Sequence, residues 1–139
     1  MRLPTLDDQP NSPKIKELDS VLMIRHAIDN GVNYLDTAYS YHDGLSELLV
    51  GKALCDGYRE KVRLATKLPV WLVQGPEDFD KFLDEQLAKL QTTYLDFYLF
   101  HALNKDNWHD VVLRHNLLAK AEAALADGRI RHLGFSFHG

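Results

Sequence analysis

Four polar residues stand at the ends of apolar runs that have the composition of β-strands: Asp36, Lys67, His101 and Ser136. They recur at nearly regular intervals, and a helix-like segment lies within each interval. In an alternating β/α fold with a parallel sheet, the carboxyl ends of the strands open on one face, and that face carries the chemistry. The spacing therefore predicts that four unlike polar groups meet at one place.

Asp36 and Lys67 have opposite charges at the ends of consecutive strands, so they can pair in the mouth of the sheet. Tyr41 follows on the loop that leaves the first of these strands and can approach Lys67. A lysine ammonium beside a phenol favours loss of the phenol's proton. Tyr41 would then be a general acid that works near neutral pH and donates a proton to a substrate oxygen. Lys67 would favour loss of the Tyr41 hydroxyl proton, and Asp36 would hold Lys67 in place. His101 can hydrogen-bond the same substrate oxygen and orient it.

Each of these residues also has a purely structural interpretation. Asp36 and Lys67 can form an ion pair that only orients the scaffold. Tyr41 can pack on the surface of its loop, and His101 can satisfy backbone carbonyls at a strand end. The presence of all of them at successive strand ends favours the chemical interpretation. Asp96, at the start of a buried strand, is expected to cap or pair at the opposite, structural end of the sheet.

Strand and helix patterns alternate along the whole chain. In the first helix we expect Ser12 as the N-cap, Pro13 as the first helical residue and Gly31 just past the end. The predicted strands are 32–36, 62–68, 95–101 and 130–137. The predicted helices are 13–30, 46–55, 76–90 and a segment within 108–127 that is helical at least from Asn116. Such alternation implies right-handed crossovers and a parallel sheet with helices outside. An open doubly wound sheet and part of a (β/α)8 barrel both satisfy this pattern.

Composition narrows the class of protein. The chain has 139 residues, of which 45% are hydrophobic and 26% charged, as in a folded globular domain. No linker or repeat divides it, so we expect one domain over residues 1–139. The net charge of -4 and the absence of a Lys/Arg cluster argue against nucleic acid or an anionic membrane surface as a partner.

Cysteine usage and the chain's opening residues indicate a cytoplasmic location. Cys55 is the single cysteine, which excludes a disulfide framework and suits a reducing compartment. No apolar run reaches the roughly 20 residues of a membrane span, and residues 1–4 lack the apolar core of a signal peptide. The histidines fall on different elements without a carboxylate partner at helical spacing, so we expect no metal site.

Several segments together resemble the aldo-keto reductase family. The stretch Gly31-Val-Asn-Tyr-Leu-Asp-Thr-Ala-Tyr-Ser-Tyr41, followed by Ser46-Glu47 and by Gly51-Lys-Ala-Leu54, resembles the family's first signature. Later blocks of the family resemble, in the same order, residues 65–67, 95–101 and 128–136. The resemblance covers residues 13–138, which is nearly the whole chain.

The resemblance implies a (β/α)8 barrel that transfers hydride from a nicotinamide cofactor, NADPH or NADH, to a small aldehyde or ketone. It implies that Tyr41 is the general acid, that Lys67 and Asp36 tune it, and that His101 orients the carbonyl. Asp36 and Ser136 would also lie near the nicotinamide, with Ser136 offering its hydroxyl to the carboxamide. The alternative is a non-catalytic relative that binds a cofactor or a partner protein, but such a role would not require the whole proton-transfer set.

The chain departs from the family's pattern in sequence and in length. The family commonly follows the serine with asparagine, whereas Phe137 and His138 follow Ser136 here. The two ends of the chain resemble a microbial branch in which some members carry an added iron–sulfur domain, but a single cysteine supplies no cluster. A complete barrel needs about 250 residues, so the resemblance implies that the family's first strand precedes Met1 and its last three strands follow the fourth strand here.

We therefore expect a partial barrel. The loops after strands 7 and 8, where such barrels commonly bind phosphate, lie outside it. These 139 residues alone are expected to bind NADPH weakly or not at all and to show no measurable reductase activity. A four-stranded sheet also leaves two unpaired edges, through which the chain would self-associate.

Overall fold

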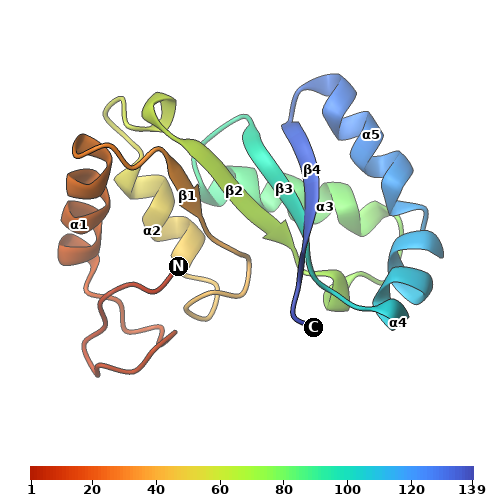
Figure 1. The fold of residues 1–139 in the computed structure, drawn as a ribbon, viewed down its shortest axis with the longest axis horizontal. Coiled ribbons are helices and arrows are strands. Elements are labelled where there is room, and N and C mark those ends of the chain that lie inside the picture. The colour runs from red at the N-terminus through yellow and green to blue at the C-terminus, as the bar shows by residue number, and fades with distance from the viewer.

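The computed structural model describes all residues, Met1–Gly139, as four strands with helices between them (Figure 1). The strands are β1 (Tyr34–Asp36), β2 (Arg63–Leu68), β3 (Leu95–Leu103) and β4 (Ile130–Phe137). The α-helices are α1 (Glu17–Asp29), α2 (Ser46–Ala53), α3 (Glu77–Lys89), α4 (Lys105–Asn107) and α5 (Leu117–Asp127). Shorter 3-10 turns cover Arg59–Lys61 and Val70–Leu72, and a π-helical turn covers Trp108–Leu113. None of these helices combines the length and the apolar character needed to cross a membrane.

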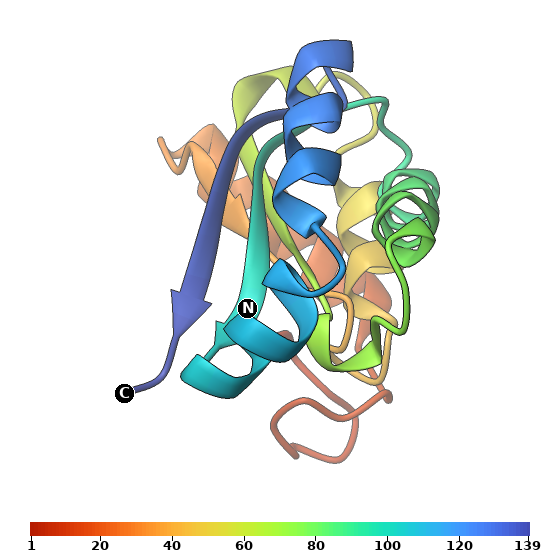
Figure 2. The ribbon, with the colours of Figure 1, turned by 90° about the vertical axis from the view of Figure 1, so that its right-hand side faces the viewer.

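The sheet is parallel throughout, and its strands follow the order of the chain, β1-β2-β3-β4. A doubly wound sheet would reverse direction at a switch point, whereas here every crossover advances one strand the same way. Figure 2 shows the helices on one side of the sheet and no helix on the other. The order and the one-sided helices make the fold a partial (β/α)8 barrel, which decides between the two architectures that periodicity left open.

The core lies between the outer face of the sheet and the helices. The inner face of α3 supplies Phe79 and Leu83, which are fully buried. The two central strands supply Leu64, Leu68 and Tyr98, also fully buried. Alternation along each strand turns the intervening residues toward the helix-free face. Lys67 and His101 therefore belong to the inside of the barrel.

The predicted start of the first helix is wrong. α1 begins at Glu17, and Ser12 instead organises a turn: its Oγ donates to Asp7 Oδ2 at 2.9 Å and accepts from Lys14 N at 3.1 Å. Its carbonyl also accepts a hydrogen bond from His42 Nδ1 at 2.7 Å. Serine side chains compete with helices by binding nearby backbone in turns, and here a distant histidine adds to that preference.

The other predicted elements are present within a few residues, but β3 continues past its predicted end at His101. The pairing of β3 with β4 shifts between Phe100 and Leu103, and Ala102 has a φ of 53°. This is a β-bulge, which interrupts the backbone ladder. At the interruption the Ala102 N–H donates to Ser136 Oγ at 2.7 Å. A side chain of β4 thus replaces a backbone acceptor.

Candidate active site

Lys67 is the centre of the cluster at the strand ends. Its Nζ lies 2.9 Å from Asp36 Oδ1 and 3.0 Å from Asp36 Oδ2, and it donates to the Thr37 carbonyl at 2.9 Å. It also donates to the Tyr41 hydroxyl at 3.0 Å. The lysine side chain is 6% exposed and the aspartate side chain 36% exposed. The pair therefore lies at the mouth of the barrel, with the ammonium inside and the carboxylate toward solvent.

The loop between β1 and α2 folds back so that Tyr41 reaches Lys67. Thr37 Oγ1 and Ser46 Oγ are 2.8 Å apart and close the base of this loop. Its tip, His42-Asp43-Gly44, has φ values of 52°, 55° and 84°. Residues other than glycine rarely adopt this left-handed conformation, and three in succession reverse the chain sharply just after the tyrosine.

His42 fastens the loop to the N-terminal segment. The fully buried ring donates from Nδ1 to the Ser12 carbonyl at 2.7 Å and accepts at Nε2 from Leu3 N at 3.1 Å. These two bonds assign the neutral ring with its proton on Nδ1. The backbone N–H of His42 also donates to Asn11 Oδ1 at 2.7 Å. Sequence reasoning did not single out His42, because nothing in periodicity pairs a loop residue with a segment about thirty residues earlier.

His101 lies beside the tyrosine. The two rings stand edge to face, with centroids 5.8 Å apart and planes at 83°, and the centroid of the Trp71 ring lies 5.1 Å from that of His101. Burial, the charge of Lys67 and the charge of His138 lower the pKa of His101 from 6.5 to about 4. The imidazole is therefore neutral at pH 7 and can donate from one ring nitrogen. Its buried Nδ1 has no hydrogen-bond partner in the protein.

Ser136 occupies a different position from the other predicted residues. Its Oγ accepts from Ala102 N at the bulge, next to His101 in the chain. The hydroxyl proton remains free to donate. The structure thus brings Asp36, Tyr41 and Lys67 into direct hydrogen-bond contact and packs His101 against Tyr41, whereas Ser136 contacts the backbone of the neighbouring strand.

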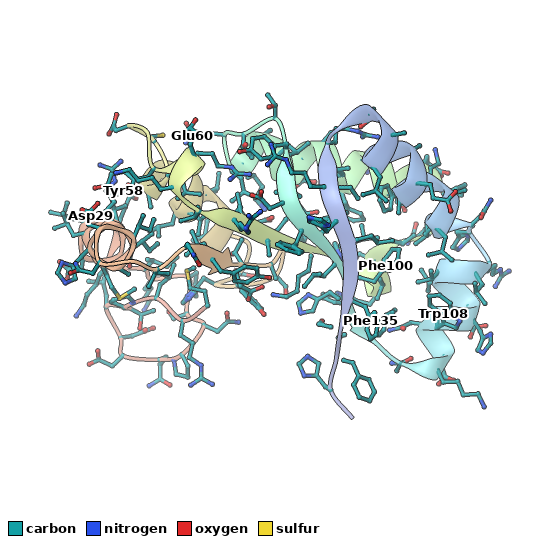
Figure 3. All side chains as sticks on the ribbon, turned by 45° about the horizontal axis from the view of Figure 1, so that its top comes forward. Asp29, Tyr58, Glu60, Phe100, Trp108 and Phe135 are labelled. Atoms are coloured by element: carbon teal, nitrogen blue, oxygen red, sulfur yellow. The ribbon has the colours of Figure 1, made fainter.

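An apolar pocket of about 520 Å³ lies away from this cluster. Phe100, Trp108 and Phe135 line it, and Figure 3 shows them between β4 and the π-helical turn. Successive side chains of a strand point to opposite faces, so Phe135 and Ser136 face away from each other. The apolar pocket therefore belongs to the helix side of the sheet and not to the polar cluster. No group of three or more His, Cys, Asp or Glu residues is arranged to hold a metal ion.

The fold is that of a known protein family. The chain belongs to the aldo/keto reductase family, whose sequence model matches residues 5–139. Methylglyoxal reductase YeaE of Escherichia coli is 36% identical over 116 residues, which are 84% of this chain and 38% of that protein. Aldo-keto reductase YhdN of Bacillus subtilis is 34% identical over 129 residues, 86% of this chain and 37% of that protein. The family predicted from the sequence is confirmed.

Solved structures agree with the partial barrel. An aldo/keto reductase from Klebsiella pneumoniae in complex with NADP and acetate matches with a TM-score of 0.76 and 33% identity, over 88% of this chain and 41% of that one. A Klebsiella pneumoniae aldo-keto reductase in complex with NADPH matches with a TM-score of 0.79 and 28% identity, over 99% of this chain and 49% of that one. The chain spans less than half the length of these relatives.

Proposed function

We propose that residues 1–139 belong to an NADPH-dependent reductase that converts an aldehyde or ketone to an alcohol, and that they carry its proton-transfer residues. The observation that carries the proposal is the 3.0 Å hydrogen bond between Lys67 Nζ and the Tyr41 hydroxyl. Reduction of a carbonyl needs a proton for the oxygen as carbon receives hydride, and a phenol next to an ammonium is suited to supply it.

In this mechanism Tyr41 donates its hydroxyl proton to the carbonyl oxygen, and the ammonium of Lys67 stabilises the phenolate that remains. Asp36 and the Thr37 carbonyl hold Lys67 in place. His101, neutral at pH 7, donates a hydrogen bond to the same oxygen and orients it. NADPH, when bound, supplies the hydride.

The residues present suit the nicotinamide end of the cofactor. The Ser136 hydroxyl keeps a proton to donate to the carboxamide, since its oxygen accepts from Ala102. Asp36 presents a part-exposed carboxylate at the same end of the sheet. Residues 1–139 do not include the loops after strands 7 and 8, where such barrels commonly build the phosphate site. We therefore propose that these 139 residues alone bind NADPH weakly and have no measurable reductase activity.

The test uses the longest polypeptide encoded around residues 1–139, assayed by NADPH oxidation with a reactive aldehyde. General acids contribute about 100-fold to 10,000-fold, so Tyr41→Phe is expected to lower kcat by at least about 100-fold. Tyr39→Phe is the matched control: the Tyr39 hydroxyl lies on the same loop but donates to Glu85 Oε1 outside the cluster. Unchanged turnover in Tyr41→Phe would show that the assigned roles are wrong and would favour a non-catalytic binding protein.

A second assay tests the 139-residue chain by itself. NADPH oxidation that is detectable with this chain and abolished by Tyr41→Phe would contradict the proposed inactivity of the partial barrel.

A further inference from the structure

A polar side chain lies in the core directly beneath the cluster. Gln86 is fully buried on the inner face of α3, where the other inward positions carry Phe79, Phe82, Leu83 and Leu87. An apolar residue would satisfy the helix pattern at position 86. A buried amide there is costly unless all its hydrogen bonds are made, so its contacts identify what it does.

The Gln86 amide connects three elements. Its Nε2 donates to the backbone carbonyl of Lys67 at 2.8 Å and to Glu47 Oε2 at 3.0 Å. Its Oε1 accepts from the Tyr98 hydroxyl at 2.6 Å. Donor and acceptor ends of the amide are thus both used, and the Lys67 carbonyl depends on Gln86 for this bond.

Glu47 sets the orientation of that amide. This carboxylate on α2 is fully buried; its Oε2 accepts from Thr66 Oγ1 at 2.8 Å, and Lys89 Nζ lies 3.2 Å from Oε1. Burial raises the pKa of Glu47. A carboxylate facing the amide accepts only from its NH2 end, so Glu47 turns the donors of Gln86 toward the strand.

The Lys67 carbonyl that Gln86 binds lies next to the end of β2, where the backbone hydrogen bonds of the sheet stop. β2 ends at Leu68, and Pro69 has no N–H to continue the ladder. The hydrogen bond from Gln86 of α3 therefore holds the end of the strand that carries Lys67. A shift there would move Nζ relative to Tyr41, and the contact between these two groups depends on a separation of 3.0 Å.

We propose that Gln86, oriented by Glu47, is a positioning residue for Lys67. Its role in catalysis rests on the function proposed above. Gln86 contacts no reacting group. It fixes the backbone of Lys67 so that the ammonium meets the Tyr41 hydroxyl in the geometry that proton transfer requires.

The first test needs no catalysis. The 139-residue chain is labelled with 13C at lysine Cε and tyrosine Cζ, and the Lys67 and Tyr41 signals are assigned by their loss in Lys67→Met and Tyr41→Phe. Gln86→Leu is expected to shift both signals. Asp96→Asn is the matched control, because it disrupts a buried polar contact at the other end of the sheet.

Two results would overturn the inference. In one, Gln86→Leu folds and leaves the Lys67 and Tyr41 signals in place. In the other, Asp96→Asn shifts them as much as Gln86→Leu at a similar loss of stability, which would mean that the effect is general loosening. If Gln86→Leu does not fold, Gln86→Met keeps the side-chain length, removes the same hydrogen bonds and carries the same expectation.

The second test uses the longest polypeptide encoded around residues 1–139. Gln86→Leu is expected to lower kcat about tenfold to 100-fold with little change in KM, because small displacements of catalytic groups cost rate. Equal kcat values in the two proteins would contradict the positioning role. If the unaltered polypeptide has no reductase activity, the proposed function fails, and the spectroscopic comparison alone decides whether Gln86 positions Lys67.

Discussion

His101 makes the stability of the chain depend on pH in a way that can be isolated. Its pKa is lowered to about 4 in the folded chain, first by burial and then by the charges of Lys67 and His138, whereas the unfolded value is 6.5. The unfolded chain therefore binds the proton more readily. Above pH 6.5 both states are neutral and the full stability is present; as pH falls from 6.5 toward 4, stability is lost.

The size of the effect follows from the two pKa values. The two pKa values differ by about 2.5, and each pKa unit corresponds to about 1.4 kcal/mol, so the upper limit is about 3.5 kcal/mol. The ring lies next to the half-exposed Trp71, so water screens part of this effect. Only about half of the titration falls between pH 7 and pH 5, and we expect a loss of about 1 kcal/mol over that range.

Urea unfolding of the 139-residue chain and of His101→Gln, each at pH 7 and pH 5, measures this loss. Carboxylates titrate in both proteins, so the difference between the two pH dependences isolates the histidine. The unaltered chain should lose about 1 kcal/mol more than the variant. NMR titration of the His101 ring should show no protonation near pH 6.5. A midpoint at 6.5, or equal pH dependence in the two proteins, would refute the argument.

Three further predictions concern other parts of the chain. Asp96→Asn should cost about 3 kcal/mol in urea unfolding, because it leaves the Arg59 guanidinium, 3.0 Å from Asp96 Oδ2, without its buried partner; a loss below about 1 kcal/mol would contradict this. His42→Ala should accelerate amide hydrogen exchange at Leu3, whose N–H loses its acceptor. Exchange equal to that of the unaltered chain would show that the His42 ring does not hold the N-terminal segment. Sedimentation should show self-association through the unpaired edge of β4, and a strict monomer at high concentration would exclude it.

Much of the fold followed from local patterns that the structure preserves. Regular alternation predicted the parallel strands, and Lys67 followed from the end of its strand because proline limits strand extension there. The contact of Lys67 with Asp36 and Tyr41 followed from charge and loop position. The structure also places Asp96 where the sequence predicted a structural pairing, against Arg59.

The parts that sequence reasoning missed depend on contacts between distant segments. Ser12 has the composition of a helix cap, yet the chain around it turns to meet His42. Gln86 interrupts an apolar helix face and could have been noticed as an exception, but its partners lie on three other elements. Single-residue patterns carry no information about which distant groups will pair, so these roles became visible only in three dimensions.

The bond between Ser136 and the Ala102 amide makes one side chain responsible for two properties. The Ser136 side chain holds β4 in register with the irregular end of β3, and its hydroxyl proton is the one proposed to be donated to the carboxamide of the cofactor. In a library that randomises position 136 to alter cofactor preference, variants that cannot accept the hydrogen bond from Ala102 would therefore fold poorly and be lost first. Variants that keep a short side-chain oxygen, such as Ser136→Thr, should dominate the surviving clones even before any selection for cofactor is applied.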